Sequence, residues 1–152
     1  MQIIKQDEKR TFYSMFLPRL EAWPDRLDID SGCFGLLLAY DARSGAEEAL
    51  RALAERTLAQ GLVYLCAWGP DCKRVHDLFE RAIVAREEER GDDDTVMTTW
   101  HEDESLEEAA WYFAHVASPS PGYAERCRAM VVAAVGNQEW LATLSSGVMA
   151  PA

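Results

Sequence analysis

Four short segments rich in apolar, β-branched or aromatic residues constrain the fold of this chain most strongly. They are residues 35–40, 62–68, 95–100 and 129–135. Segments of this length and composition are typical of strands that are buried on both faces of a sheet. Apolar residues at helical spacing follow each segment, and this pattern predicts one helix after each strand.

The alternation of strands and helices predicts an α/β domain with three layers, Rossmann-like or flavodoxin-like. Helices would cover both faces of a four-stranded, mainly parallel sheet. Right-handed crossovers restrict the strand order, and the two simple orders are 2-1-3-4 and 3-2-1-4. The whole chain, residues 1–152, is expected to form this single domain. Residues 1–34 are predicted to be an N-terminal cover segment whose structure the pattern leaves open, and residues 148–152 a loose tail.

Negative charge is concentrated in the middle of the chain. The formal net charge is −11, and residues 61–117 contain 5 basic and 14 acidic side chains. An acidic surface repels phosphate groups, so we expect no direct contact with nucleic acid. The same surface suits a basic protein partner. No apolar run is as long as a membrane helix, and the first residues lack the apolar region of a signal peptide, so we expect a cytoplasmic protein without membrane contact.

The expected redox state of the cysteines follows from this location. Without a secretion signal, the four cysteines are expected to be reduced thiols that form no disulfide. Cys66 and Cys127 are predicted to be buried in strands. Cys33 and Cys72 are the candidates for reaction with a thiol reagent, although Cys72 also begins the apolar stripe of a predicted helix and is better explained as a buried thiol.

The densest group of ionisable side chains follows the third predicted strand. Residues 101–104 read His-Glu-Asp-Glu, and residues 105–108 have the Ser-x-x-Glu form of a capping box, which predicts a helix from residue 106. Ligands of open parallel sheets bind where the carboxyl ends of the strands meet. Asp41 follows the first strand and would lie at the same edge. The sequence therefore predicts a functional site at this edge.

The predicted function is that of a non-enzymatic binding module, such as an inhibitor, an immunity-type protein or a regulatory subunit, that engages a basic protein. The charge and the lack of catalytic motifs both favour it. Trp100 and Trp111 would be aromatic anchors. The carboxylates of Glu102, Asp103 and Glu104 would attract the partner.

The alternative is a small enzyme or a small-ligand sensor. In it, His101 would act as a general base, with Glu102, Asp103 and Asp41 as its neighbouring carboxylates. The sequence contains neither a Gly-x-Ser-x-Gly elbow nor a phosphate-binding glycine loop, so it offers no nucleophile of that type and predicts no cofactor.

Two further patterns lie around the second predicted strand. Cys72 and His76 are neighbours on one predicted helix and, with His101, are the weak candidates for metal ligands. No Cys-x-x-Cys or His-Glu-x-x-His motif supports them, so no metal site is predicted. Residues 65–73, Leu-Cys-Ala-Trp-Gly-Pro-Asp-Cys-Lys, resemble the Trp-Cys-Gly-Pro-Cys-Lys turn of thioredoxins. Gly69 stands where the attacking cysteine of that turn would be.

Overall fold

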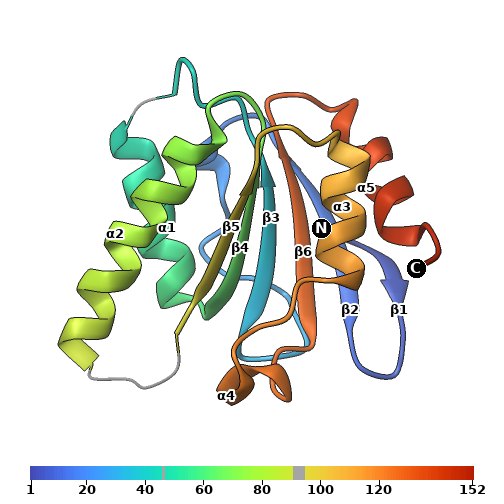
Figure 1. The fold of residues 1–152 in the computed structure, drawn as a ribbon, viewed down its shortest axis with the longest axis horizontal. Coiled ribbons are helices and arrows are strands. Elements are labelled where there is room, and N and C mark those ends of the chain that lie inside the picture. The colour runs from blue at the N-terminus through green and yellow to red at the C-terminus, as the bar shows by residue number, and fades with distance from the viewer. Residues whose placement is uncertain (46, 91–94) are drawn as a thin grey trace.

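The protein is built on one mixed sheet (Figure 1). The computed structural model describes residues 1–45, 47–90 and 95–152, and in these residues it has six strands in the order β1-β2-β6-β3-β4-β5. Only β1 is antiparallel to its neighbour. The strands are β1 (Gln2–Gln6), β2 (Thr11–Leu17), β3 (Phe34–Ala39), β4 (Leu62–Trp68), β5 (Met97–His101) and β6 (Ala129–Val135).

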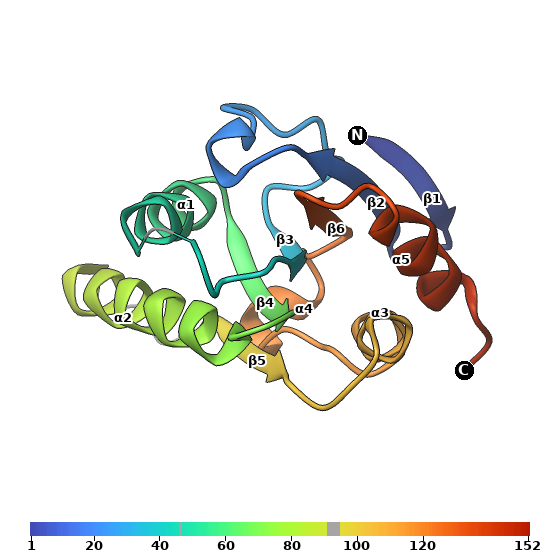
Figure 2. The same cartoon turned by 90° about the horizontal axis from the view of Figure 1, so that it is seen from above.

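Helices cover both faces of this sheet, as Figure 2 shows from above. Helices α1 and α2 lie on one face, and α3 and α5 on the other. No helix of the described residues has the length and the apolar content that a membrane span requires. The helices are α1 (Glu47–Ala59), α2 (Cys72–Arg90), α3 (Leu106–His115), α4 (Pro121–Ala124) and α5 (Trp140–Met149), and a 3-10 helix, η1, spans Leu20–Ala22.

The α/β class predicted from the sequence is confirmed. The four predicted strands correspond to β3, β4, β5 and β6, which lie side by side and parallel. Their order from β5 to β6 is 3-2-1-4, one of the two that the sequence allowed. Burial on both sides explains the unbroken apolar run in β3. Leu36 and Leu38 pack toward α1 and α2, while Leu37 packs toward α3 and α5.

The predicted sheet of four strands was too small. Residues 1–34, expected as a cover of uncertain structure, supply β1 and β2, and β2 pairs along its whole length with β6. Phe12 and Tyr13 of β2 pack on opposite faces of the sheet, so this strand lacks the polar–apolar alternation of a half-exposed strand. The later part of the segment does cover the sheet, since Trp23 is buried and its indole donates a hydrogen bond to Gln60.

The expected loose tail, residues 148–152, is also corrected in part. Val148 is fully buried and belongs to α5, which continues to Met149. Beyond the helix, the carbonyl oxygen of Pro151 accepts a hydrogen bond from the indole of Trp111, at 2.9 Å. The end of the chain is therefore held against α3.

Helices α3 and α5 approach each other closely at Gly147, which we expect to be essential for this contact. A Cβ atom built on Gly147 would lie 2.5 Å from the carbonyl oxygen of Glu107 and 2.6 Å from the Cβ of Ala110. Gly147→Ala should destabilise the protein by about 1–3 kcal/mol, because the helices must separate. Helix propensity alone predicts the opposite sign, a gain of about 1 kcal/mol.

Urea denaturation measures this difference. Gly32→Ala is the control, because no heavy atom lies within 4 Å of the added methyl group, and it should change the free energy of unfolding by less than about 0.5 kcal/mol. A Gly147→Ala variant more stable than the native protein would contradict the close packing of α3 and α5.

Candidate functional site

The turn between β5 and α3 is held in place by the neighbouring strand. The indole nitrogen of Trp68, at the end of β4, donates a hydrogen bond to the backbone oxygen of Glu104, at 2.8 Å. Ser105 caps α3 as predicted. Its hydroxyl accepts from the backbone of Glu108, whose carboxylate in turn accepts from the backbone of Ser105. The start of α3 is thus fixed at Leu106.

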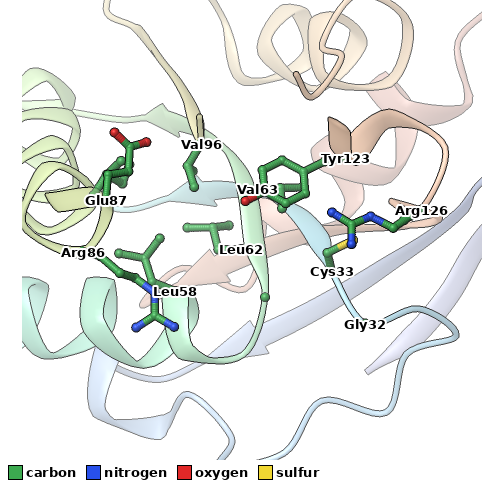
Figure 3. Close-up of a pocket in the computed structure, with 12 residues that line it drawn as sticks. Gly32, Cys33, Leu58, Leu62, Val63, Arg86, Glu87, Val96, Tyr123 and Arg126 are labelled. Atoms are coloured by element: carbon green, nitrogen blue, oxygen red, sulfur yellow. The ribbon is translucent and has the colours of Figure 1, made fainter. Parts of the chain in front are cut away.

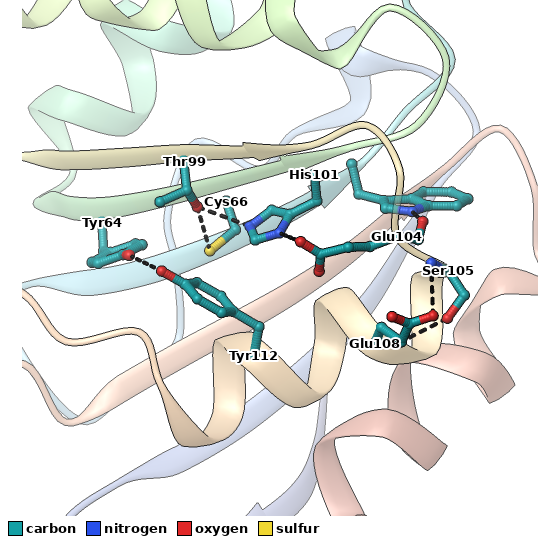
Figure 4. A network of polar contacts seen from close by, with 9 residues as sticks. Tyr64, Cys66, Thr99, His101, Glu104, Ser105, Glu108 and Tyr112 are labelled. Carbon is teal, nitrogen blue, oxygen red and sulfur yellow. Dashed lines mark hydrogen bonds and ion pairs between the residues drawn. The ribbon is translucent and has the colours of Figure 1, made fainter.

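His101 lies at the centre of a buried polar network (Figure 4). Its ring is only 4% exposed, with Nδ1 2.9 Å from the carboxylate of Glu104 and Nε2 2.9 Å from the hydroxyl of Thr99. A carboxylate oxygen only accepts hydrogen bonds, so Nδ1 is the donor to Glu104. The ring also packs against Tyr112 of α3, at 4.8 Å between centroids. His101 therefore connects the turn, the strand and the helix.

The network continues to a cysteine that is not a usable nucleophile. Thr99 lies two residues before His101 on β5, so both side chains point to the α3 face of the sheet. The hydroxyl oxygen of Thr99 lies 3.3 Å from the sulfur of Cys66, within hydrogen-bond distance. Burial raises the pKa of the Cys66 thiol to about 12. A thiol with this pKa stays protonated near neutral pH, so the cluster lacks a thiolate for attack.

A groove opens beside this network, and we name it the acidic groove. It has a volume of about 390 Å³. Each of its three carboxylates has one oxygen in contact with the protein: Glu104 with His101, Glu107 with the hydroxyl of Ser146, and Glu108 with the cap of α3. The second oxygen of each has no hydrogen-bond partner among the described residues. The groove is lined by Glu104, Glu107, Glu108, Trp111, Tyr112 and Ala150.

The structure divides the predicted binding residues between two faces. Trp111 lines the acidic groove, whereas Trp100 packs on the α2 side, 4.4 Å from the ring of His76 and 5.7 Å from the amino group of Lys73. Both indoles are partly exposed, at 36% and 40%. Trp100 and His101 are consecutive on a strand, so they point to opposite faces. Side chains alternate between the two faces of any strand, so this separation of Trp100 from His101 could have been predicted from the sequence.

The predicted catalytic residues are also separated. Glu102 and Asp103 are exposed in the turn, and it is Glu104 that contacts His101. Asp41 lies beyond β3 and forms a 2.7 Å ion pair with Arg43. The positions of Thr99 and Tyr112 around His101 were not predicted, because the contact between β5 and α3 is tertiary.

The weak metal candidates do not converge. Cys72 is buried at the start of α2, and His76 contacts Asp77, with Nδ1 3.1 Å from the carboxylate. The imidazole of His101 points to the other face of the sheet. No group of three or more potential ligands of a metal occurs in the part of the chain that the structure describes.

The backbone requires a glycine at position 69, in the turn that resembles that of thioredoxins. Gly69 has a φ angle of 124°, and a Cβ atom there would lie 2.2 Å from the carbonyl oxygen of Tyr40. A cysteine at this position would therefore collide with the backbone after β3. Cys66 and Cys72 are both free thiols. The turn lacks the side chain that disulfide exchange requires.

A second cavity lies at the opposite edge of the sheet, where β3 and β4 begin (Figure 3). Its volume is about 290 Å³, and its walls include Cys33, Tyr123 and the two arginines Arg86 and Arg126. No sequence pattern predicted this cavity. Ligands of open parallel sheets bind at the other edge, so the topology does not favour this cavity as the functional site.

The hydrogen bond between Glu104 and His101 should contribute measurably to stability. Glu104→Ala leaves the buried Nδ1 donor of His101 without its acceptor and should lower the free energy of unfolding by about 1–3 kcal/mol. Glu102→Ala removes an exposed carboxylate two residues away and should cost less than about 0.5 kcal/mol. Denaturant titration of both variants makes the comparison. Equal effects would show that the buried contact is unimportant.

Three of the four cysteines should react slowly in the native protein. All are buried and free, and burial also raises the pKa of Cys127 to about 12. Of the two candidates predicted to react, Cys72 is fully buried, so only Cys33, which lines a cavity, should react at an intermediate rate. Titration with an aromatic disulfide reagent should count four thiols after unfolding. Fast reaction of Cys66 in the native protein would contradict the structure.

Comparison with known proteins identifies a family. No curated protein matches the chain. Residues 15–148 match the sequence model of a family described as a domain of unknown function, DUF7684. The matched region runs from within β2 almost to the end of α5, and it includes the His101 network. Because the match covers most of its 152 residues, the chain belongs to the DUF7684 family.

Proposed function

We propose that this domain is a non-enzymatic binding module whose acidic groove receives a basic segment of a protein partner. The observation that carries the proposal is the composition of the groove. Three carboxylates, Glu104, Glu107 and Glu108, border an apolar surface made by Trp111 and its neighbours. This combination suits an apolar side chain flanked by lysine or arginine residues.

The charge around the groove supports a basic partner. Residues 101–117 contain five carboxylates and neither lysine nor arginine. Glu102 and Asp103 are exposed in the turn that leads to the groove and extend its negative surface. Like charges gathered on one side of a protein accelerate association with an oppositely charged partner, and this effect weakens as salt is added. Residues 91–94, which belong to the acidic middle part of the sequence, residues 61–117, lie outside the described residues.

Trp111 has the features of an anchor. Its indole is partly exposed, and its N–H group is already bonded to Pro151, so the orientation of the ring is fixed before any partner binds. A rigid aromatic side chain loses little entropy on binding. Binding energy at protein interfaces is concentrated in such residues. An inhibitor, an immunity-type protein or a regulatory subunit of the cytoplasm would use a surface of this kind.

The alternative function, a small enzyme or sensor with His101 at its centre, has less geometric support. Both ring nitrogens of His101 are engaged inside the protein, and the ring is buried. A general base must reach the proton that it removes. On the binding proposal, His101 holds Glu104 at the groove. His101→Ala would then lower stability, whereas on the enzymatic alternative it would abolish turnover.

Two double variants of equal charge test the proposal. Glu107→Gln with Glu108→Gln removes two charges from the groove, and glutamine retains the cap of α3. Glu47→Gln with Glu48→Gln removes two charges from the first turn of α1, on the other face of the sheet. Each variant and the native protein serve as bait for proteins of the source cell. A partner of the groove should be lost with the first variant and kept with the second.

Kinetic measurements on that partner separate charge from anchoring. The groove variant should reduce the association rate and flatten its dependence on salt, since exposed charges act mainly on encounter. Trp111→Ala should instead raise the dissociation rate and cost about 2 kcal/mol or more, as expected for a hot spot. A partner whose affinity is unchanged by both substitutions binds elsewhere, and the proposal would then be wrong.

A further inference from the structure

The order in which the chain adds strands reverses at β3, and a ligand site is expected at this point of the sheet. From β3 the chain proceeds outward to β4 and β5, and then returns to place β6 on the other side of β3. The connections that leave the ends of β3 and β6 therefore diverge. In open parallel sheets, ligands bind in the crevice that this divergence leaves. Figure 2 looks onto this edge of the sheet.

A cavity of about 440 Å³ occupies this position. It lies away from the acidic groove and shares no lining residue with it. Its size is that of a site for one small molecule. Its walls come from the segments that follow β2, β3 and β6 and from the starts of α1 and α5. The residues used in the argument below are Arg19, Glu21, Tyr40, Asp41, Ser44 and Asn137, with Trp140 as the large apolar side chain.

Three uncharged polar groups in the cavity wall are available to a ligand. Among the described residues, the hydroxyls of Tyr40 and Ser44 have no hydrogen-bond partner. The side-chain oxygen of Asn137 accepts from the backbone of Glu139, at 3.0 Å, which leaves its amide nitrogen as a donor. Hydroxyl groups both donate and accept, so this set matches a ligand that does the same.

The charges of the wall disfavour an anionic ligand. Arg19 is 3.6 Å from Glu21, and Asp41 forms its ion pair with Arg43, so both carboxylates in the wall already have cationic partners. Burial raises the pKa of the Tyr40 hydroxyl, the negative charges of Glu21 and Asp41 raise it further, and the positive charge of Arg74 opposes them. The hydroxyl of Tyr40 therefore stays neutral near neutral pH. The sequence also lacks the glycine loop that binds phosphate.

We propose that this cavity binds a neutral, hydroxyl-rich small molecule of the size of a monosaccharide or a nucleoside. Its hydroxyl groups would exchange hydrogen bonds with Tyr40, Ser44 and Asn137. Its less polar face would lie against Trp140 and Val135, which line the cavity beside them. The site is independent of the acidic groove, so either can exist without the other.

Titration followed by ¹H–¹⁵N NMR tests this site, with D-ribose, D-glucose and adenosine as neutral probes and ribose 5-phosphate as the charged one. At least one neutral probe should cause saturable shifts of the Trp140 indole signal and of the Asn137 side-chain signal. Ribose 5-phosphate should bind at least tenfold more weakly than ribose, because its phosphate approaches carboxylates without a phosphate loop.

Tyr40→Phe is the test variant, because it removes one hydroxyl and keeps the ring. It should weaken binding of the neutral probe about tenfold, the effect of one lost hydrogen bond. Trp111→Phe, in the acidic groove, is the control and should leave binding unchanged. The amide spectrum reports whether each variant is folded. The proposal is overturned if no neutral probe binds, if ribose 5-phosphate binds best, or if Tyr40→Phe binds like the native protein.

Discussion

The parallel pairing of β6 with two strands from the first quarter of the chain is the constraint on which the structure depends. β6 is joined to β2 on one side and to β3 on the other, and every one of its residues is buried. Alanines at 129, 133 and 134 keep the strand thin enough for helices to pack on both faces. Without β6, the N-terminal pair β1 and β2 would have no contact with the rest of the sheet.

The same pairing determines where functional residues can meet. It puts the ends of β2, β6 and β3 around one cavity, and it leaves β5 at the far edge of the sheet. The His101 network therefore forms away from the divergence of the strands, against α3. There it supports the acidic groove, because the carboxylate of Glu104, which contacts His101, lines the groove.

The two proposed sites differ in the physical basis of recognition. The acidic groove has carboxylate oxygens without a hydrogen-bond partner among the described residues, and it has an aromatic surface, so in the proposed function long-range attraction would precede short-range contact. In the cavity beside β3, the carboxylates have cationic partners and neutral polar groups line the wall, so recognition of the proposed ligand would depend on hydrogen bonds of defined geometry. A single protein can use both, because the groove lies along α3 and α5 while the cavity opens at the ends of the strands.

The sequence by itself determined the local features of the protein. Unbroken apolar runs identified β3, β4 and β6, because strands buried on both faces need no polar side chains. The Ser-x-x-Glu pattern located the start of α3, because the capping box is formed within four residues. The strand order was reduced to two possibilities by the handedness of crossovers, but local patterns carry no information that chooses between them.

Only the tertiary structure decided how distant residues combine. The sequence left the structure of β2 open, and it is a strand because β6 offers it a partner 118 residues along the chain, Thr11 beside Ala129. Residues 102–104 are three adjacent acidic residues that the sequence pattern does not distinguish. Only the carboxylate of Glu104 contacts His101, because the indole of Trp68 holds the backbone of the turn. These outcomes depend on packing between elements, which composition and spacing do not encode.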